Sequence, residues 1–125
     1  MLRKNELTGT EKLLSTIVES IKEKKGKEII SIDLQKLEQS ITDYFIICHA
    51  DSNTQVDAIT DSIIDNVKGN FKTSPYHKEG IKNLQWVLLD YSTVIVHIFQ
   101  KEFRDFYKLE ELWADGKILK FDYEL

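Results

Sequence analysis

The stretch that decides the fold is WVLLDYSTVIVHIF, which occupies residues 86–99. Two runs rich in β-branched and aromatic residues, 86–91 and 94–99, are separated only by Ser92-Thr93, and this spacing predicts a β-hairpin with a tight turn. A two-residue link also fixes which residues face one another across the strands. The expected pairs are Tyr91 with Val94, Leu89 with Val96 and Val87 with Ile98 on one face, and Trp86 with Phe99, Leu88 with His97 and Asp90 with Ile95 on the other.

Further strands are expected on both sides of this hairpin. Residues 28–34 are short, β-branched and alternate apolar with polar positions, which predicts a strand. Residues 43–49 hold the nearly continuous apolar run YFIIC, which is typical of a strand buried on both faces. A short edge strand is expected at 76–79. The C-terminal stretch 117–125 is either another short strand or a loose tail.

Three segments have the apolar spacing of amphipathic helices. The first runs from about residue 10 to 25, and Thr8 is placed to cap it. The second begins after Ser52 and is expected to end at Gly69. The third is expected as one helix over residues 101–114. With the strands, these helices give the order α-β-β-α-β-β-β-α, which predicts a mixed α/β (α+β) fold with a single mixed sheet of about five strands and helices packed on it.

Composition narrows the class of protein. The chain has 125 residues, 42% of them hydrophobic, which is enough for one core without disulfides or a metal. We expect a single domain over 1–125, with 1–7 and 117–125 as its candidate loose tails. Cys48 is the only cysteine, which fits a reducing compartment. The start of the chain lacks the pattern of a secretory leader, and no apolar run is as long as a membrane span, so we expect a cytoplasmic protein.

Charge argues against a nucleic-acid-binding protein. The net charge is −4, from 21 acidic and 17 basic residues. Proteins that bind nucleic acid gain most of their affinity by neutralising phosphates. If the partner is a ribonucleoprotein, we therefore expect the contact to fall mainly on a basic protein component.

Residues with catalytic potential are few. The chain has no phosphate-binding glycine loop, no paired cysteines and no metal-ligand spacing, so we expect no enzymatic activity and no cofactor. Asp90 and His97 share a predicted sheet face and lie diagonally within side-chain reach. No nucleophile or electrophile converges on them, which favours a structural role over acid–base catalysis. Cys48 and His49 are adjacent in a strand and should point to opposite faces.

Several motifs follow one another in a set order along most of the chain. They are ITDYFIIC at 41–48, Ser52, Gln55-Val56, Ala58-Ile59, Glu79-Gly80, WVLLDY at 86–91, VIVHIF at 94–99 and RDFYKLEELW at 104–113. This ordered set resembles the ribosomal silencing factor family, also called the Iojap-like family. Three positions, His49-Ala50, Thr54 and Ser92-Thr93, depart from the Ser-Gly, the basic residue and the Gly-Asp that are common in the family.

The resemblance implies a fold related to nucleotidyltransferases, without the Gly-Ser and paired-Asp signature of the active enzymes. It also implies a translational repressor. Family members bind large-subunit ribosomal protein fourteen, block joining of the small subunit when nutrients are scarce, and are often homodimers. An acidic chain suits a basic ribosomal protein as its partner, with little direct nucleic-acid contact and no membrane.

We expect the contact surface to come from the hairpin and the last helix. Exposed aromatic side chains are common anchors of protein interfaces, and aromatic residues concentrate in this part of the chain. The alternative is that the aromatic residues belong to the core and the acidic ones to a solvated helix face. Two other functions stay open, a nucleotide-binding enzyme of nucleotidyltransferase type and a general dimeric adaptor with a non-ribosomal partner. The candidate contact residues are Trp86, Asp90, His97, Asp105, Tyr107 and Glu110.

Overall fold

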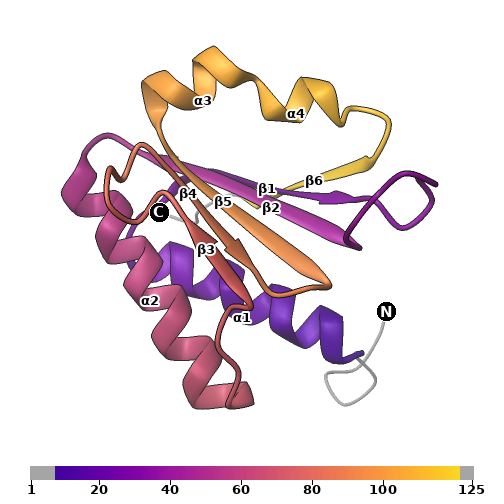
Figure 1. The fold of residues 1–125 in the computed structure, drawn as a ribbon, viewed down its shortest axis with the longest axis horizontal. Coiled ribbons are helices and arrows are strands. Elements are labelled where there is room, and N and C mark those ends of the chain that lie inside the picture. Colours follow the sequence, from indigo (N-terminus) through magenta and orange to yellow (C-terminus); the bar gives the residue numbers. More distant parts are fainter. Residues whose placement is uncertain (1–7, 122–125) are drawn as a thin grey trace.

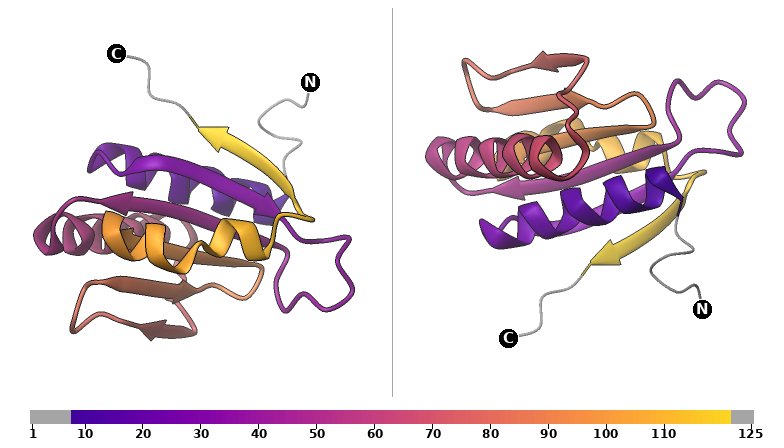
Figure 2. Two further views of the ribbon diagram at one scale, coloured as in Figure 1. Left: turned by 90° about the horizontal axis from the view of Figure 1, so that it is seen from above. Right: turned by 90° about the horizontal axis from the view of Figure 1, so that it is seen from below.

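The computed structural model describes residues 8–121, and the fold is given for that part of the chain. A single sheet lies between two layers of helices (Figures 1 and 2). Its strands are β1 (Lys27–Asp33), β2 (Tyr44–Ala50), β3 (His77–Glu79), β4 (Trp86–Asp90), β5 (Val94–Gln100) and β6 (Lys117–Phe121). Its helices are α1 (Gly9–Glu23), α2 (Asn53–Phe71), α3 (Lys101–Tyr107) and α4 (Leu109–Leu112).

The sheet is mixed, as predicted, and its strand order is β3-β4-β5-β2-β1-β6. β2 and β5 run parallel at its centre, whereas the other neighbouring strands are antiparallel. α1 and α2 cover one face, and α3 and α4 cover the other (Figure 1). β2 is buried on both faces from Phe45 to Ala50, which confirms the prediction made from its continuous apolar run.

The two faces of the sheet at β2 carry different kinds of side chain. Cys48 belongs to the apolar cluster under α1 and α2, whereas His49 contacts Arg104 of α3 on the opposite face. The expectation that these neighbours point apart is therefore confirmed. Burial raises the pKa of the Cys48 thiol to about 12, so it is protonated at neutral pH and is a poor nucleophile.

The hairpin has the predicted register. Trp86 lies opposite Phe99, Leu88 opposite His97, and Asp90 opposite Ile95. The turn needs no glycine because Ser92 adopts a left-handed conformation, with φ of 74°. Its N–H donates to the Asp90 side chain at 2.7 Å, which stabilises this otherwise unfavourable conformation.

Two helix boundaries differ from the prediction. α2 does not end at Gly69 but continues to Phe71, where Lys72 forms the left-handed cap with φ of 54°. The expected single helix over 101–114 is two helices, because Lys108 adopts φ of 50° between α3 and α4. This break lets Leu109 point into the core, where it is buried against the sheet. The N-terminal prediction is confirmed, since Thr8 caps α1 in a complete capping box with Glu11.

The described residues form six strands, one more than the number expected. The additional strand is β6, which pairs antiparallel with β1 along residues 117–121. That part of the candidate C-terminal tail is therefore a strand. The segments 1–7 and 122–125, which were also considered as tails, lie outside the described residues.

Gly80 positions the start of β4. Its φ is 79°, and a Cβ atom built there would lie 1.9 Å from the carbonyl oxygen of Trp86. A non-glycine residue would meet both a strained backbone conformation and a clash with main-chain atoms that cannot rotate away. Gly69 is the opposite case, because it lies within α2 and a Cβ atom would have no neighbour within 4 Å.

We therefore expect Gly80→Ala and Gly69→Ala to change stability in opposite directions. Gly80→Ala should lower the free energy of unfolding by about 1–3 kcal/mol or more, because the strained backbone and the steric overlap add to one another. Gly69→Ala should raise it by roughly 0.5–1 kcal/mol, because alanine restricts the unfolded chain and favours the helix. Urea unfolding followed by circular dichroism measures both. Equal stabilities of the two variants would contradict this account of the turn.

Candidate partner-binding surface

The sheet face under α3 brings three of the six predicted contact residues together. Trp86 on β4 and His97 on β5 share this face, and α3 places Tyr107 against Trp86 with ring centroids 4.9 Å apart. Trp86 also stacks on Phe99, the residue directly opposite it, at 4.8 Å. Helix α3 follows β5 without a loop, which explains why residues of the hairpin and of the last helix meet.

Five rings form a continuous series from the core to the surface, which we call the aromatic series. Successive ring centroids are 4.6, 5.9, 4.9 and 5.1 Å apart. The exposed fraction of the residue increases towards the outer end, from 4% for His97 to 46% for Tyr107 and 76% for Phe106. A buried aromatic base thus supports an exposed aromatic tip. In order, the series is Phe45, His97, Trp86, Tyr107 and Phe106.

His97 is a buried, neutral residue. Its Nδ1 accepts a hydrogen bond from the indole Nε1–H of Trp86 at 3.0 Å, so the imidazole proton must lie on Nε2. Burial lowers the pKa of His97 to about 3. Its Nε2 is buried and has no hydrogen-bond partner among residues 8–121, a situation that typically costs about 1–3 kcal/mol. His97 is therefore too deep to touch a partner directly.

Asp90 does not contact His97, although the two share a sheet face. The Asp90 carboxylate accepts from the backbone N–H of Ser92, and His97 Nδ1 is occupied by Trp86. The diagonal contact that the register allowed is therefore not made. Asp90 is half-buried at the hairpin turn, at the end of β4 remote from Trp86.

The two predicted acidic residues of the last helical segment differ in role. Asp105 is exposed and forms an ion pair with Lys101 one turn earlier, with Nζ and Oδ2 2.8 Å apart. Glu110 is half-buried and accepts from Arg104 Nε at 2.6 Å. Only Asp105 is therefore fully available at the surface, and its exposed pairing with Lys101 contributes little to stability.

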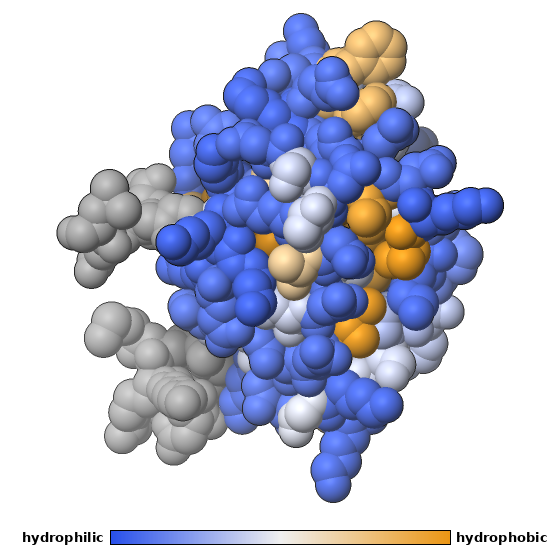
Figure 3. All heavy atoms as spheres, turned by 90° about the vertical axis from the view of Figure 1, so that its left-hand side faces the viewer, coloured by the Kyte–Doolittle hydropathy of each residue, from blue (hydrophilic) through white to orange (hydrophobic). Residues whose placement is uncertain are grey.

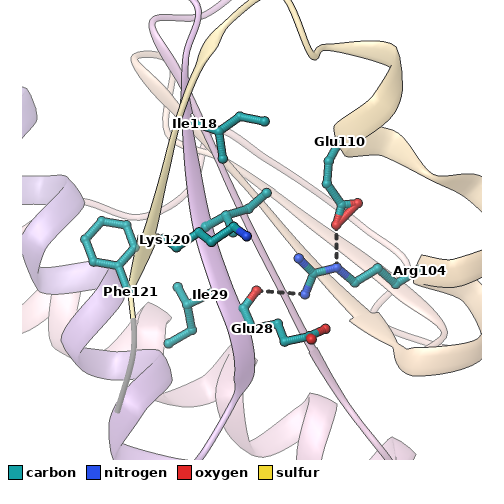
Figure 4. Close-up of a pocket in the computed structure, with 8 residues that line it drawn as sticks. Glu28, Ile29, Arg104, Glu110, Ile118, Lys120 and Phe121 are labelled. Atoms are coloured by element: carbon teal, nitrogen blue, oxygen red, sulfur yellow. Dashed lines mark hydrogen bonds and ion pairs between the residues drawn. The ribbon is translucent and has the colours of Figure 1, made fainter. Parts of the chain in front are cut away.

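Arg104 of α3 contacts β1, β2 and α4. Figure 4 shows its contacts with Glu28 and Glu110. It is buried, and its Nη1 donates to the carbonyl of Glu28 at 2.8 Å. That carbonyl is available because β1 has an irregular register here and Glu28 adopts φ of 46°. The remaining partners are the carbonyl of Lys27 at 3.4 Å, Glu110 of α4, and His49 Nδ1 of β2 at 2.9 Å. Because the cation is buried, loss of any one of these partners is costly.

The contact with Arg104 also determines the state of His49. A guanidinium can only donate, so His49 Nδ1 must accept and carries no proton. Burial first, and the positive charge of Arg104 second, lower the pKa of His49. The carboxylate of Glu28 lies 3.7 Å from the same nitrogen, but it cannot receive a hydrogen bond from an unprotonated Nδ1.

A hollow of about 430 Å³ lies beside Arg104, between β1, β6 and α4 (Figure 4). Its lining mixes apolar side chains with both signs of charge: Glu28, Ile29, Ile30, Arg104, Glu110, Ile118, Lys120 and Phe121. Within residues 8–121, no group of three or more His, Cys, Asp or Glu side chains is arranged to hold a metal ion. The same part of the chain contains no helix long and apolar enough to cross a membrane.

Sequence reasoning missed two residues of this region. Phe106 is the most exposed ring of the aromatic series, but its position in an apolar helix suggested core as readily as surface. Arg104 occurs in the RDFYKLEELW motif, yet nothing in its spacing indicated burial. The space-filling view shows apolar side chains exposed within an otherwise hydrophilic surface (Figure 3).

The fold and this surface define a class, a mixed α/β domain whose buried polar and aromatic residues support exposed aromatic side chains. The chain belongs to the ribosomal silencing factor family, because the model of the family described as "Ribosomal silencing factor during starvation" matches residues 8–124. Its members act in ribosome silencing and translation regulation.

Relatives and solved structures agree with this assignment. The chain is 36% identical to the ribosomal silencing factor of Bacillus subtilis over 101 residues, 81% of this chain and 84% of that one. It is 37% identical to the Haemophilus influenzae protein of the same name, covering 82% and 98% of the two chains. The crystal structure of protein CV0518 from Chromobacterium violaceum superposes with a TM-score of 0.81 at 31% identity, over 94% of this chain and 95% of that one.

The buried state of His97 predicts a specific loss of stability in acid. Its pKa is about 3 in the folded protein and about 6.5 in the unfolded chain. The unfolded state therefore binds the proton first, and stability falls as the pH drops below about 6.5. We expect the stability of the wild type relative to His97→Leu to fall by roughly 1 kcal/mol per pH unit between pH 6 and 4.

Urea unfolding of both proteins across this pH range measures the effect. The subtraction removes the contributions of carboxylates and of the other histidines, which the two proteins share. A difference in stability that does not change with pH would show that His97 is solvated or charged in the folded protein.

Proposed function

We propose that this protein is a cytoplasmic translational repressor that binds the large ribosomal subunit through large-subunit ribosomal protein fourteen and sterically blocks joining of the small subunit when nutrients are limiting. It acts by occupying a surface and catalyses no reaction. The family assignment supports the role in ribosome silencing. The choice of partner and the steric mechanism are our proposal.

The observation that carries the proposal is the exposed end of the aromatic series. Phe106 and Tyr107 are adjacent in α3 and present a large apolar area to solvent, while Trp86 lies directly behind Tyr107. Aromatic side chains held rigidly from behind lose little conformational entropy on binding. Such residues usually supply most of the binding energy of a protein interface.

Charge supports a basic partner. The net charge is −4, and Glu102, Asp105 and Glu111 are exposed on α3 and α4, close to the aromatic tip in sequence. Charges at the rim of an interface mainly accelerate encounter with a partner of opposite sign and contribute less to the final affinity. We assign Asp105 to this rim. Glu110 holds Arg104 and therefore supports the surface from behind.

A homodimer is part of the proposal. An exposed aromatic tip that binds a ribosomal protein in one setting can be covered by a second copy in another. Sedimentation equilibrium of the free protein measures this directly. A monomer at all accessible concentrations would remove the dimer from the proposal and leave the ribosomal contact untouched.

The direct test of the repressor uses purified ribosomal subunits. The protein should co-sediment with large subunits and not with small subunits, and it should lower the yield of joined ribosomes in a light-scattering assay. Large subunits reconstituted with and without protein fourteen identify the partner. Failure to bind large subunits, or binding without any effect on subunit joining, would contradict the proposal.

Substitutions at the aromatic tip should weaken binding without unfolding the protein. Phe106→Ala and Tyr107→Ala should each lower the affinity for large subunits by at least about tenfold, the effect typical of a central aromatic contact. Leu119→Ala is the matched control, because Leu119 is an exposed apolar residue on β6, at the opposite edge of the sheet.

Quantitative co-sedimentation measures the three affinities, and circular dichroism checks the folding of each variant. If Leu119→Ala weakens binding as much as the α3 variants do, or if neither α3 variant weakens it, the contact lies elsewhere on the molecule.

A further inference from the structure

The hydrogen bond between Trp86 and His97 leaves another polar atom of His97 buried without a partner. The indole Nε1–H donates to His97 Nδ1 at 3.0 Å, and this leaves the His97 Nε2–H buried without a partner among the described residues. A polar hydrogen removed from water without a partner lowers stability. A leucine at this position would fill similar space under α3 and remove this N–H, but it would leave the Trp86 indole N–H without its acceptor. The histidine therefore spends a buried, unpartnered N–H to hold the N–H of a half-buried tryptophan.

The surroundings of His97 hold its ring in one orientation. Phe45 packs against it edge-on, with centroids 4.6 Å apart and an interplanar angle of 78°. Phe99, the next residue along β5 on the same face, lies nearly parallel to it at 6.4 Å. An imidazole that is fixed by neighbouring rings offers its acceptor nitrogen at a fixed point on the sheet face.

Trp86 is therefore held at two places. Its ring plane stacks on Phe99, 28° from parallel, and its Nε1–H is directed to His97. Stacking alone would allow the indole to slide or to turn over on Phe99, whereas the hydrogen bond selects one orientation. Tyr107 packs against the indole held in this orientation, with ring centroids 4.9 Å apart and planes tilted by 45°.

We propose that His97 is a positioning residue for the partner-binding surface: by accepting the indole proton it fixes the orientation of Trp86, which in turn presents Tyr107 and Phe106 in the conformation that binds. His97 does not touch the partner. The effect on partner binding rests on the proposed function, whereas the orientation of Trp86 rests on the hydrogen-bond geometry alone.

Two variants with opposite properties test the inference. His97→Leu removes both the acceptor and the unpartnered N–H. It also leaves the indole N–H of the half-buried Trp86 without an acceptor, so the two effects oppose one another. The variant should unfold close to the wild-type temperature, yet bind large subunits at least fivefold more weakly. His97→Asn is smaller and leaves a gap in the core, but its amide oxygen can take the place of Nδ1. It should unfold at a lower temperature, yet bind more tightly than His97→Leu.

The crossed order of stability and affinity is the decisive result, because a merely structural residue would change both in the same direction. Thermal unfolding and co-sedimentation of the full chain give the two quantities. If the affinities follow the unfolding temperatures, or if His97→Leu binds as tightly as the wild type, the inference is wrong.

A second measurement stays informative even if the protein does not bind ribosomes. The indole N–H of Trp86 gives its own signal in a ¹H–¹⁵N spectrum, and a Trp113→Phe variant assigns it, since the chain has two tryptophans. We expect the His97→Leu variant to move this signal, to speed its exchange with solvent and to weaken the Trp86–Tyr107 nuclear Overhauser effects, and the Asn variant to restore them in part. An unchanged signal would overturn the inference, whereas a changed signal with no ribosome binding would overturn only the proposed function.

Discussion

The parallel pairing of β2 with β5 is the constraint on which the rest of the structure depends. Both strands are apolar along nearly their whole length and are buried on both faces, so the chain must provide a helical layer on each side. α1 and α2 form one layer from the segments that precede and follow the first two strands. The other layer has to come from the residues after β5. This requirement places α3 over β5 and β2, where its Tyr107 packs against Trp86.

Placing α3 over the sheet face brings polar groups into the interior, and the structure accommodates each of them differently. Arg104 is satisfied by two backbone carbonyls, a carboxylate and a histidine nitrogen, which together connect β1, β2, α3 and α4. His97 is satisfied on one nitrogen only. The first arrangement joins the elements of the fold, whereas the second leaves one buried polar atom without a partner and accepts the indole N–H of Trp86.

The aromatic series connects these interior contacts to the molecular surface. Its inner rings belong to the core, its outer rings are exposed, and Trp86 belongs to both. Rings that pack on one another from the core outwards have fewer conformations available than isolated surface side chains, which is the property that the proposed binding surface requires. The break at Lys108 contributes as well, because it ends α3 just after Tyr107 and turns Leu109 and Glu110 back towards the sheet.

The sequence by itself determined the features whose cause is local. The register of the hairpin follows from a two-residue link, the start of α1 from its capping box, and the burial of β2 from its unbroken apolar run. Only the tertiary structure decided which side chains are exposed and which polar groups meet, such as Phe106 at the surface, Arg104 in the interior, and Trp86 in place of Asp90 as the partner of His97. Periodicity shows which face of an element is apolar, but it does not show what covers that face. The pairing of β6 with β1 and the break at Lys108 likewise depend on contacts between residues far apart in the chain.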